Sequence, residues 1–249
     1  MKNKIIKVCL KIKHYFLTLI LGMLAMTANG YDRITGEAFA SRSEVIGQNG
    51  MVATSHPLAT QIGLDILKKG GTAIDAAIAA NIALGLMEPT GNGIGGDLFA
   101  IIWDAKTKQL HGLNASGPAP KNISIDYLKS QNLNKIPSYG PLPVTVPGAV
   151  DGWVKLHEKF GNQEFKSLFQ PTIDYALNGF PVTETIAYYL ERSAGRYIEY
   201  PNFSELWLKD GKTPAKGEIF KNPQLAKTLQ AIAEKGRAGF YEGEIAHTM

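Results

Sequence analysis

The sequence predicts a mixed α/β fold of the α+β kind, in which helices cover the faces of a sheet. Three observations predict it: two helical stretches at 57–69 and 72–88, a strand pair at 98–104 and 109–115, and a helical second half from Asp151 onward. The two stretches of strand character follow each other directly and do not alternate with helices. The order therefore argues against a β-α-β arrangement.

The first helix is predicted by an apolar stripe in which Leu58, Ile62 and Ile66 recur every four residues. Pro57 suits a first helical turn, and Gly70 with Gly71 ends the pattern. Before this helix, residues 50–55 are short and contain Val and Thr, which favours a strand.

The second helix is predicted to begin at a capping box formed by Thr72 and Asp75 and to end before Pro89. It is rich in Ala and Ile nearly all round, so it should be buried. Residues 98–104 are apolar and residues 109–115 alternate, so the two form a hairpin. A short helix is expected at 125–131, and further helices follow from Asp151.

Residues 1–30 have the layout of a secretory signal peptide, with five lysines before an apolar run at 15–26. Ala28 and Gly30 are small residues placed for cleavage before Tyr31. The apolar run is shorter than the roughly 20 residues that span a bilayer. We expect a periplasmic or secreted protein with one partial domain at 31–249, and an uncleaved anchor or a soluble basic arm are the alternatives.

Removal of this segment changes the formal net charge from +4 to −1, because its five lysines are accompanied by no acidic residue. The basic balance therefore gives no support for a nucleic-acid partner. The single cysteine, Cys9, leaves with the segment, which excludes a disulfide framework and a thiolate metal site in the mature chain.

Gly91, Gly93 and Gly96 have the G-x-G-x-x-G spacing of dinucleotide-binding loops. Such a loop needs a strand before it and a helix N-terminus after it. Here the predicted helix comes first and the strand follows, so a pyrophosphate would face the negative end of a helix dipole. We reject nucleotide binding and interpret the glycines as allowing positive φ and close backbone approach, and as lining a pocket.

The chain resembles the N-terminal part of the gamma-glutamyltransferase (glutathione hydrolase) family. The resemblance rests on stretches in the same order, "GMVATSHPLATQIGLDILKKGGTAIDAAIAA", "GNGIGGDLFAIIWD", "TVPGAVDGW", "YALNGFPV" and "NPQLAKTLQAIAEKG" with "FYEGEIA". It implies an N-terminal-nucleophile hydrolase fold, an αββα sandwich, of which this sequence covers only the large-subunit part.

The resemblance also implies the chemistry. Members cleave themselves into two subunits, and the new N-terminal threonine of the small subunit attacks a gamma-glutamyl amide, with its own amine as base. That threonine is expected beyond Met249, so we expect a truncated piece that has no catalytic residue of its own and is inactive alone. Its expected partner is the missing C-terminal half, and no cofactor or metal is implied.

One position departs from the family pattern. An arginine in the loop after the first hairpin holds the substrate carboxylate in the family, whereas this loop reads "LNASGPAPKN". Ser116 or Pro118 occupies the equivalent position, and neither replaces a guanidinium; Lys121 nearby is a weak substitute. The same loop is similar to acylase-type members, so an amidase with a different substrate is an alternative.

The remaining polar residues favour structural roles. His56 is interpreted as a helix entry, and His111, His157 and His247 lack metal-ligand spacing. Asp97, just after the glycines, turns the strand or touches a pocket. The Tyr-rich stretch with Arg192 and Arg196 is interpreted as a helix packing face. A non-enzymatic exported binding module, with the glycine loop and the Pro-rich connector as its cleft, is the rival function.

Overall fold

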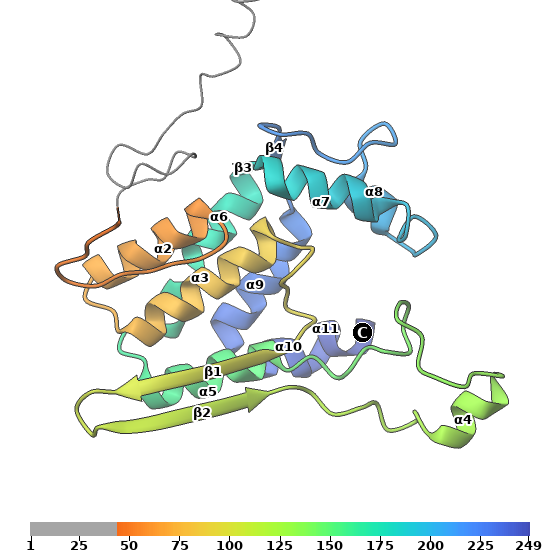
Figure 1. Cartoon of the computed structure of the whole chain (residues 1–249), viewed down its shortest axis with the longest axis horizontal. Helices are drawn as coiled ribbons and strands as arrows, with labels where there is room; N and C mark the ends of the chain where they lie inside the picture. Colours follow the sequence, from red (N-terminus) through yellow and green to blue (C-terminus); the bar gives the residue numbers. More distant parts are fainter. Residues whose placement is uncertain (1–43) are drawn as a thin grey trace, which may run out of the picture. The chain divides into compact units, whose positions relative to one another are not determined.

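The computed structural model describes residues 44–249 (Figure 1), so the expected signal peptide at 1–30 lies outside the described residues. Contacts within the chain divide it after Asn49, and the fold below is that of residues 50–249. Within residues 44–249, each helix falls short of the length and apolar character that a membrane crossing requires.

Two antiparallel-packed helices form the first half of the core. Helix α2 (Pro57–Lys68) begins at His56, whose Nδ1 accepts a hydrogen bond from the Leu58 amide at 3.3 Å. Helix α3 (Ala73–Met87) begins at the predicted capping box, in which the Asp75 amide donates to Thr72 Oγ1 and the Thr72 amide donates to Asp75 Oδ2. Nine of the fifteen residues of α3 are buried, which confirms the prediction of a buried helix.

The predicted hairpin is present as strands β1 (Leu98–Asp104) and β2 (Gln109–Ala115), paired antiparallel from Leu98 opposite Ala115 to Asp104 opposite Gln109. One face packs against helix α5 (Ala149–Phe160) (Figure 1). The other face is apolar and exposed: the exposed fractions are 67% for Phe99, 83% for Ile101, 61% for Trp103 and 68% for Leu110. The described part of the fold thus leaves one side of its main sheet bare.

The second half is helical, as predicted. Its elements are α4 (Ile125–Ser130), the 3-10 turn η1 (Phe165–Leu168), α6 (Gln170–Asn178), α7 (Glu184–Ala194), α8 (Phe203–Trp207), α9 (Pro223–Lys235), α10 (Ala238–Tyr241) and α11 (Gly243–Thr248), with a minimal pair of strands β3 (Phe180–Pro181) and β4 (Ile219–Phe220). Helices α3, α5, α6 and α9 meet around the buried rings of Trp153 and Phe169. This cluster is the core that supports the hairpin.

The prediction of a strand at 50–55 is wrong. These residues are neither strand nor helix, and none of the backbone groups of Gly50–Ala53 has a backbone hydrogen-bond partner among the described residues. A strand exists only where a neighbouring strand pairs with it. The residues of this segment favour a strand, but within residues 50–249 no strand pairs with them.

Candidate functional site

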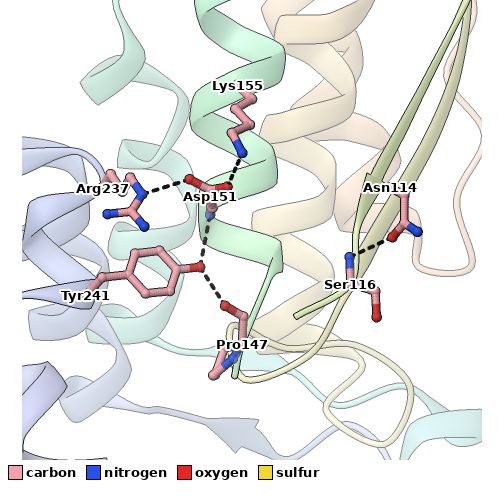
Figure 2. Close-up of polar contacts among 7 residues, drawn as sticks. All are labelled: Asn114, Ser116, Pro147, Asp151, Lys155, Arg237 and Tyr241. Carbon is pink, nitrogen blue, oxygen red and sulfur yellow. Dashed lines mark hydrogen bonds and ion pairs between the residues drawn. The ribbon is translucent and has the colours of Figure 1, made fainter. Parts of the chain in front are cut away.

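The glycine loop, the end of β2 and the Pro-rich connector meet at Asp97. Its carboxylate accepts hydrogen bonds from the Ser116 hydroxyl at 3.2 Å, from the Gly117 amide at 3.1 Å and from the Thr145 hydroxyl at 3.5 Å. The Ser116 amide donates to the Asn114 side chain at 2.9 Å, which turns the chain at the end of the strand (Figure 2). The structure thus brings two sequence-derived candidates, Asp97 and Ser116, into direct contact.

The backbones of this junction approach each other closely. The Gly96 carbonyl accepts from both the Gly148 and Ala149 amides at 3.0 Å. A Cβ atom at Gly117 would lie 1.5 Å from the carbonyl oxygen of Val146, and one at Gly148 would lie 2.0 Å from that of Ala115. No L-residue with a side chain fits either position without movement of the backbone. These two glycines were not recognised in the sequence, where neither belongs to a motif of regular spacing.

A polar cluster joins the connector to the C-terminal helices (Figure 2). The Tyr241 hydroxyl donates to the Pro147 carbonyl at 2.6 Å and accepts from the Asp151 amide at 3.1 Å. The Asp151 carboxylate pairs with Lys155 at 2.7 Å and with Arg237 at 2.8 Å. Tyr241 therefore connects α10 to the residues on both sides of Gly148, and so to the junction.

The surroundings shift two pKa values in this cluster. Burial raises the pKa of Asp151, but the ion pairs with Lys155 and Arg237 outweigh it, so the pKa of this carboxyl lies below its ordinary value. Burial raises the pKa of Tyr241, and the Asp151 carboxylate raises it further. The tyrosine is therefore protonated at neutral pH and available as a donor to Pro147.

The interpretation of the glycine loop was wrong in its physical reason. Gly91, Gly93, Gly95 and Gly96 do not have positive φ, and a Cβ atom at any of them would meet nothing closer than 3.5 Å. The expectation that the loop lines a pocket is confirmed, since residues 89–93 and 95–97 line a shallow hollow of about 430 Å³. Asp97 belongs both to this hollow and to the junction.

The two candidate substrate-binding residues, Ser116 and Pro118, lie at the surface of the junction. Ser116 and Pro118 are exposed, and the Pro118 carbonyl accepts from the Val146 amide at 3.0 Å. Lys121 is also exposed, and no hydrogen bond between described residues joins it to Asp97 or Ser116. The junction therefore holds a carboxylate and hydroxyls and receives no cation from the candidates considered.

The histidines have the structural surroundings predicted for them. His56 caps α2, and burial lowers its pKa although Glu88 opposes the shift. His157 Nε2 lies 2.7 Å from the Gln163 carbonyl, and His111 packs on Phe160. Within residues 44–249, no group of three His, Cys, Asp or Glu side chains could hold a metal ion.

The interpretation of the Tyr- and Arg-rich stretch as a packing face is wrong for Tyr188 and Tyr189, whereas Tyr197 is half-buried and packs against Phe203. Tyr188 and Tyr189 are about half exposed, because α7 buries a different face, formed by Ile186, Leu190 and Ala194. These three smaller residues recur every four positions, and this spacing is the sequence signal that identifies the buried face.

Comparison with known proteins gives a consistent assignment. The model of the Gamma-glutamyltranspeptidase family matches residues 59–249. The glutathione hydrolase-like YwrD proenzyme of Bacillus subtilis is 38% identical over 203 residues, which are 81% of this chain and 38% of that protein. The chain therefore spans well under half the length of this relative.

Two solved structures share the fold. Helicobacter pylori gamma-glutamyltranspeptidase is 32% identical, with a TM-score of 0.78 over 83% of this chain and 60% of its own chain. Cephalosporin acylase from Bacillus halodurans is 42% identical, with a TM-score of 0.79 over 88% of this chain and 42% of its own. The described residues thus form part of the N-terminal-nucleophile hydrolase fold predicted from the sequence. The chain belongs to the gamma-glutamyltranspeptidase family.

Proposed function

We propose that residues 31–249 are the large-subunit portion of an exported amidase that transfers or hydrolyses gamma-glutamyl groups. The reaction proceeds through an acyl-enzyme on the N-terminal threonine of a small subunit, whose amine acts as base. The relative from Bacillus subtilis is named a proenzyme, which supports self-cleavage into two subunits. Residues 31–249 supply scaffold and substrate contacts, with Ser116 and Pro118 at the position that meets the substrate.

The bare face of the hairpin is the observation that carries this proposal. Phe99, Ile101, Trp103 and Leu110 expose more than half of their surface on one side of β1 and β2. Apolar area gains about 25 cal/mol per Å² when it leaves water, so four large side chains favour a covering layer. The small subunit is the proposed partner that covers this face and brings the threonine to the end of the hairpin.

An acylase-type amidase with another substrate is the second candidate. It is favoured by the junction itself, since neither Ser116 nor Pro118 offers the positive charge that pairs with a glutamyl carboxylate. The 42% identity to a cephalosporin acylase points in the same direction.

Turnover with and without a small subunit tests the proposal. Residues 31–249 alone should release no product from a gamma-glutamyl anilide, and co-expression with the missing C-terminal half of a relative, small subunit included, should restore release. A phenylacetyl anilide distinguishes the acylase candidate, which prefers it over the gamma-glutamyl substrate. Measurable turnover by residues 31–249 alone would contradict the proposed origin of the nucleophile.

The rival binding module predicts a different result. Calorimetry of residues 31–249 with glutathione would give saturable binding, with no hydrolysis after the small subunit is added. Export is tested separately: N-terminal sequencing of protein from the periplasm or medium should begin at Tyr31, and a start at Met1 in a membrane fraction would identify an anchor.

A further inference from the structure

A second hollow lies beside the glycine loop, between the loop and helices α7 and α8. Its volume is about 360 Å³, enough for a small organic molecule. Its lining includes Thr90, Arg192 of α7 and Arg196 of the turn after α7, and Tyr197, Phe203 and Trp207 supply aromatic surface. The proposed small-subunit chemistry uses none of these residues.

The hollow carries uncompensated positive charge. The Arg192 guanidinium donates to the Tyr188 hydroxyl at 2.7 Å, and the Arg196 guanidinium lies over the Tyr139 ring at 4.8 Å. Neither forms an ion pair with a described residue, and no Asp or Glu is among the residues that line the hollow. Arg192 on α7 and Arg196 in the turn after it both line the hollow, and the paired N–H groups of a guanidinium match the planar oxygens of a carboxylate.

The aromatic wall of the hollow is packed against other rings. The Trp207 ring stacks on Phe220 at 4.9 Å with an angle of 5° between the planes, and Tyr197 lies 5.7 Å from Phe203. These contacts hold the aromatic surface in place beside the arginines. A ligand that fits both the arginines and the aromatic wall carries a carboxylate at one end and an apolar body at the other.

The hollow also shares lining residues with the hollow at the glycine loop. Pro89 and Thr90 line both this hollow and the shallow one that includes Asp97. We propose that Arg192 and Arg196 form a carboxylate subsite for an organic acid with an apolar body, which reaches the junction along the glycine loop. This inference rests on the proposed amidase function. The two arginines would supply the positive charge that Ser116 and Pro118 lack.

Hippurate is the probe, because it joins an aromatic ring, an amide and a carboxylate. The purified protein is titrated with hippurate by calorimetry, and hippuramide, which has the same shape without the charge, is the control ligand. Each of Arg192→Gln and Arg196→Gln should weaken binding about three- to tenfold, since the arginines are exposed and partly screened, and the double variant should lose at least about tenfold. Lys129→Gln removes one charge at an exposed position on α4 and should leave binding unchanged.

Binding of hippurate equal in wild type and in the double variant, or no binding by a wild type of normal circular dichroism, overturns the subsite. The lysine variants Arg192→Lys and Arg196→Lys should retain more affinity than the glutamine variants, and equal losses in both pairs would overturn a role of charge. In the enzyme completed with a small subunit, the double variant should raise KM for carboxylate-bearing amides and leave neutral amides unchanged. Absence of all turnover in that enzyme would count against the proposed function, while the calorimetry decides the subsite independently.

Discussion

Two glycine-containing regions of this molecule differ in what their glycines do. The loop from Gly91 to Gly96 has the spacing of a nucleotide motif, yet none of its glycines has positive φ and each has room for a Cβ atom. Gly117 and Gly148 belong to no such motif, yet each lies against a backbone carbonyl with no room for even one methyl group. The first region is thus recognised by the spacing of its glycines in the sequence, whereas in the second region the glycines are required because a side chain would clash.

Substitution of Gly148 should have the largest effect. Its backbone angles, φ −104° and ψ −20°, suit alanine, so a loss of stability comes from the clash with Ala115 and not from backbone strain. We expect Gly148→Ala to lower the free energy of unfolding by about 3 kcal/mol or to prevent folding. Urea unfolding followed by tryptophan fluorescence measures the change.

Gly195 provides the matched control for this substitution. It also lies at a helix end in the right-handed helical region, and a Cβ atom there would meet nothing within 4 Å. Gly195→Ala should therefore change the free energy of unfolding by less than about 0.5 kcal/mol. Equal effects at Gly148 and Gly195 would contradict the close approach of the connector to β2.

Removal of the Tyr241 hydroxyl should have a smaller effect on the same junction. Tyr241→Phe leaves the Pro147 carbonyl and the Asp151 amide without this partner, and we expect a loss of about 1–2 kcal/mol. Tyr189→Phe is the control, since that side chain is half exposed on α7. Thermal unfolding of both variants measures the difference, and no difference between them would mean that the hydroxyl is not needed to hold the connector.

The pH dependence of the free energy of unfolding measures the contribution of the ion pairs that Asp151 forms with Lys155 and Arg237. The native pKa of Asp151 is lowered, so its contribution is present above the ordinary carboxyl pKa of 3.8 and is lost as pH falls through the native value. The difference in unfolding free energy between wild type and Asp151→Asn should be below about 1 kcal/mol at pH 7 and vanish once the pH has fallen below the lowered native pKa. A difference that stays constant across this range would exclude the ionised carboxylate as its source.

The local elements of this fold were predictable, because their signals lie within a few residues. Thr72 and Asp75 are three positions apart, and the hairpin of β1 and β2 is closed by a short turn. The prediction of a strand at 50–55 was wrong because a strand forms only with a partner strand, which can lie far away in the sequence. Family resemblance supplied the remainder of the fold class.

The junction could not be predicted from such signals. Gly117 meets Val146, and Tyr241 meets Pro147, across separations of 29 and 94 residues. Only the packed chain shows that these backbones touch. Arg192 and Arg196 were noted in the sequence, but the hollow that they line depends on which face of α7 is buried. The sequence interpretation assigned burial to the face of the tyrosines, which is the wrong face.

The smallest effect is expected in the glycine loop, at Gly95. A Cβ atom there would meet nothing within 4 Å, and φ is not positive, so alanine fits the native backbone. Alanine also restricts the unfolded chain, which raises stability where the native angles allow it. We expect Gly95→Ala to change the free energy of unfolding by between zero and about +0.5 kcal/mol, measured by the same urea titration as for Gly148→Ala. A loss above about 1 kcal/mol would mean that the loop carries a steric demand of its own, and the contrast between the two glycine regions would then no longer hold.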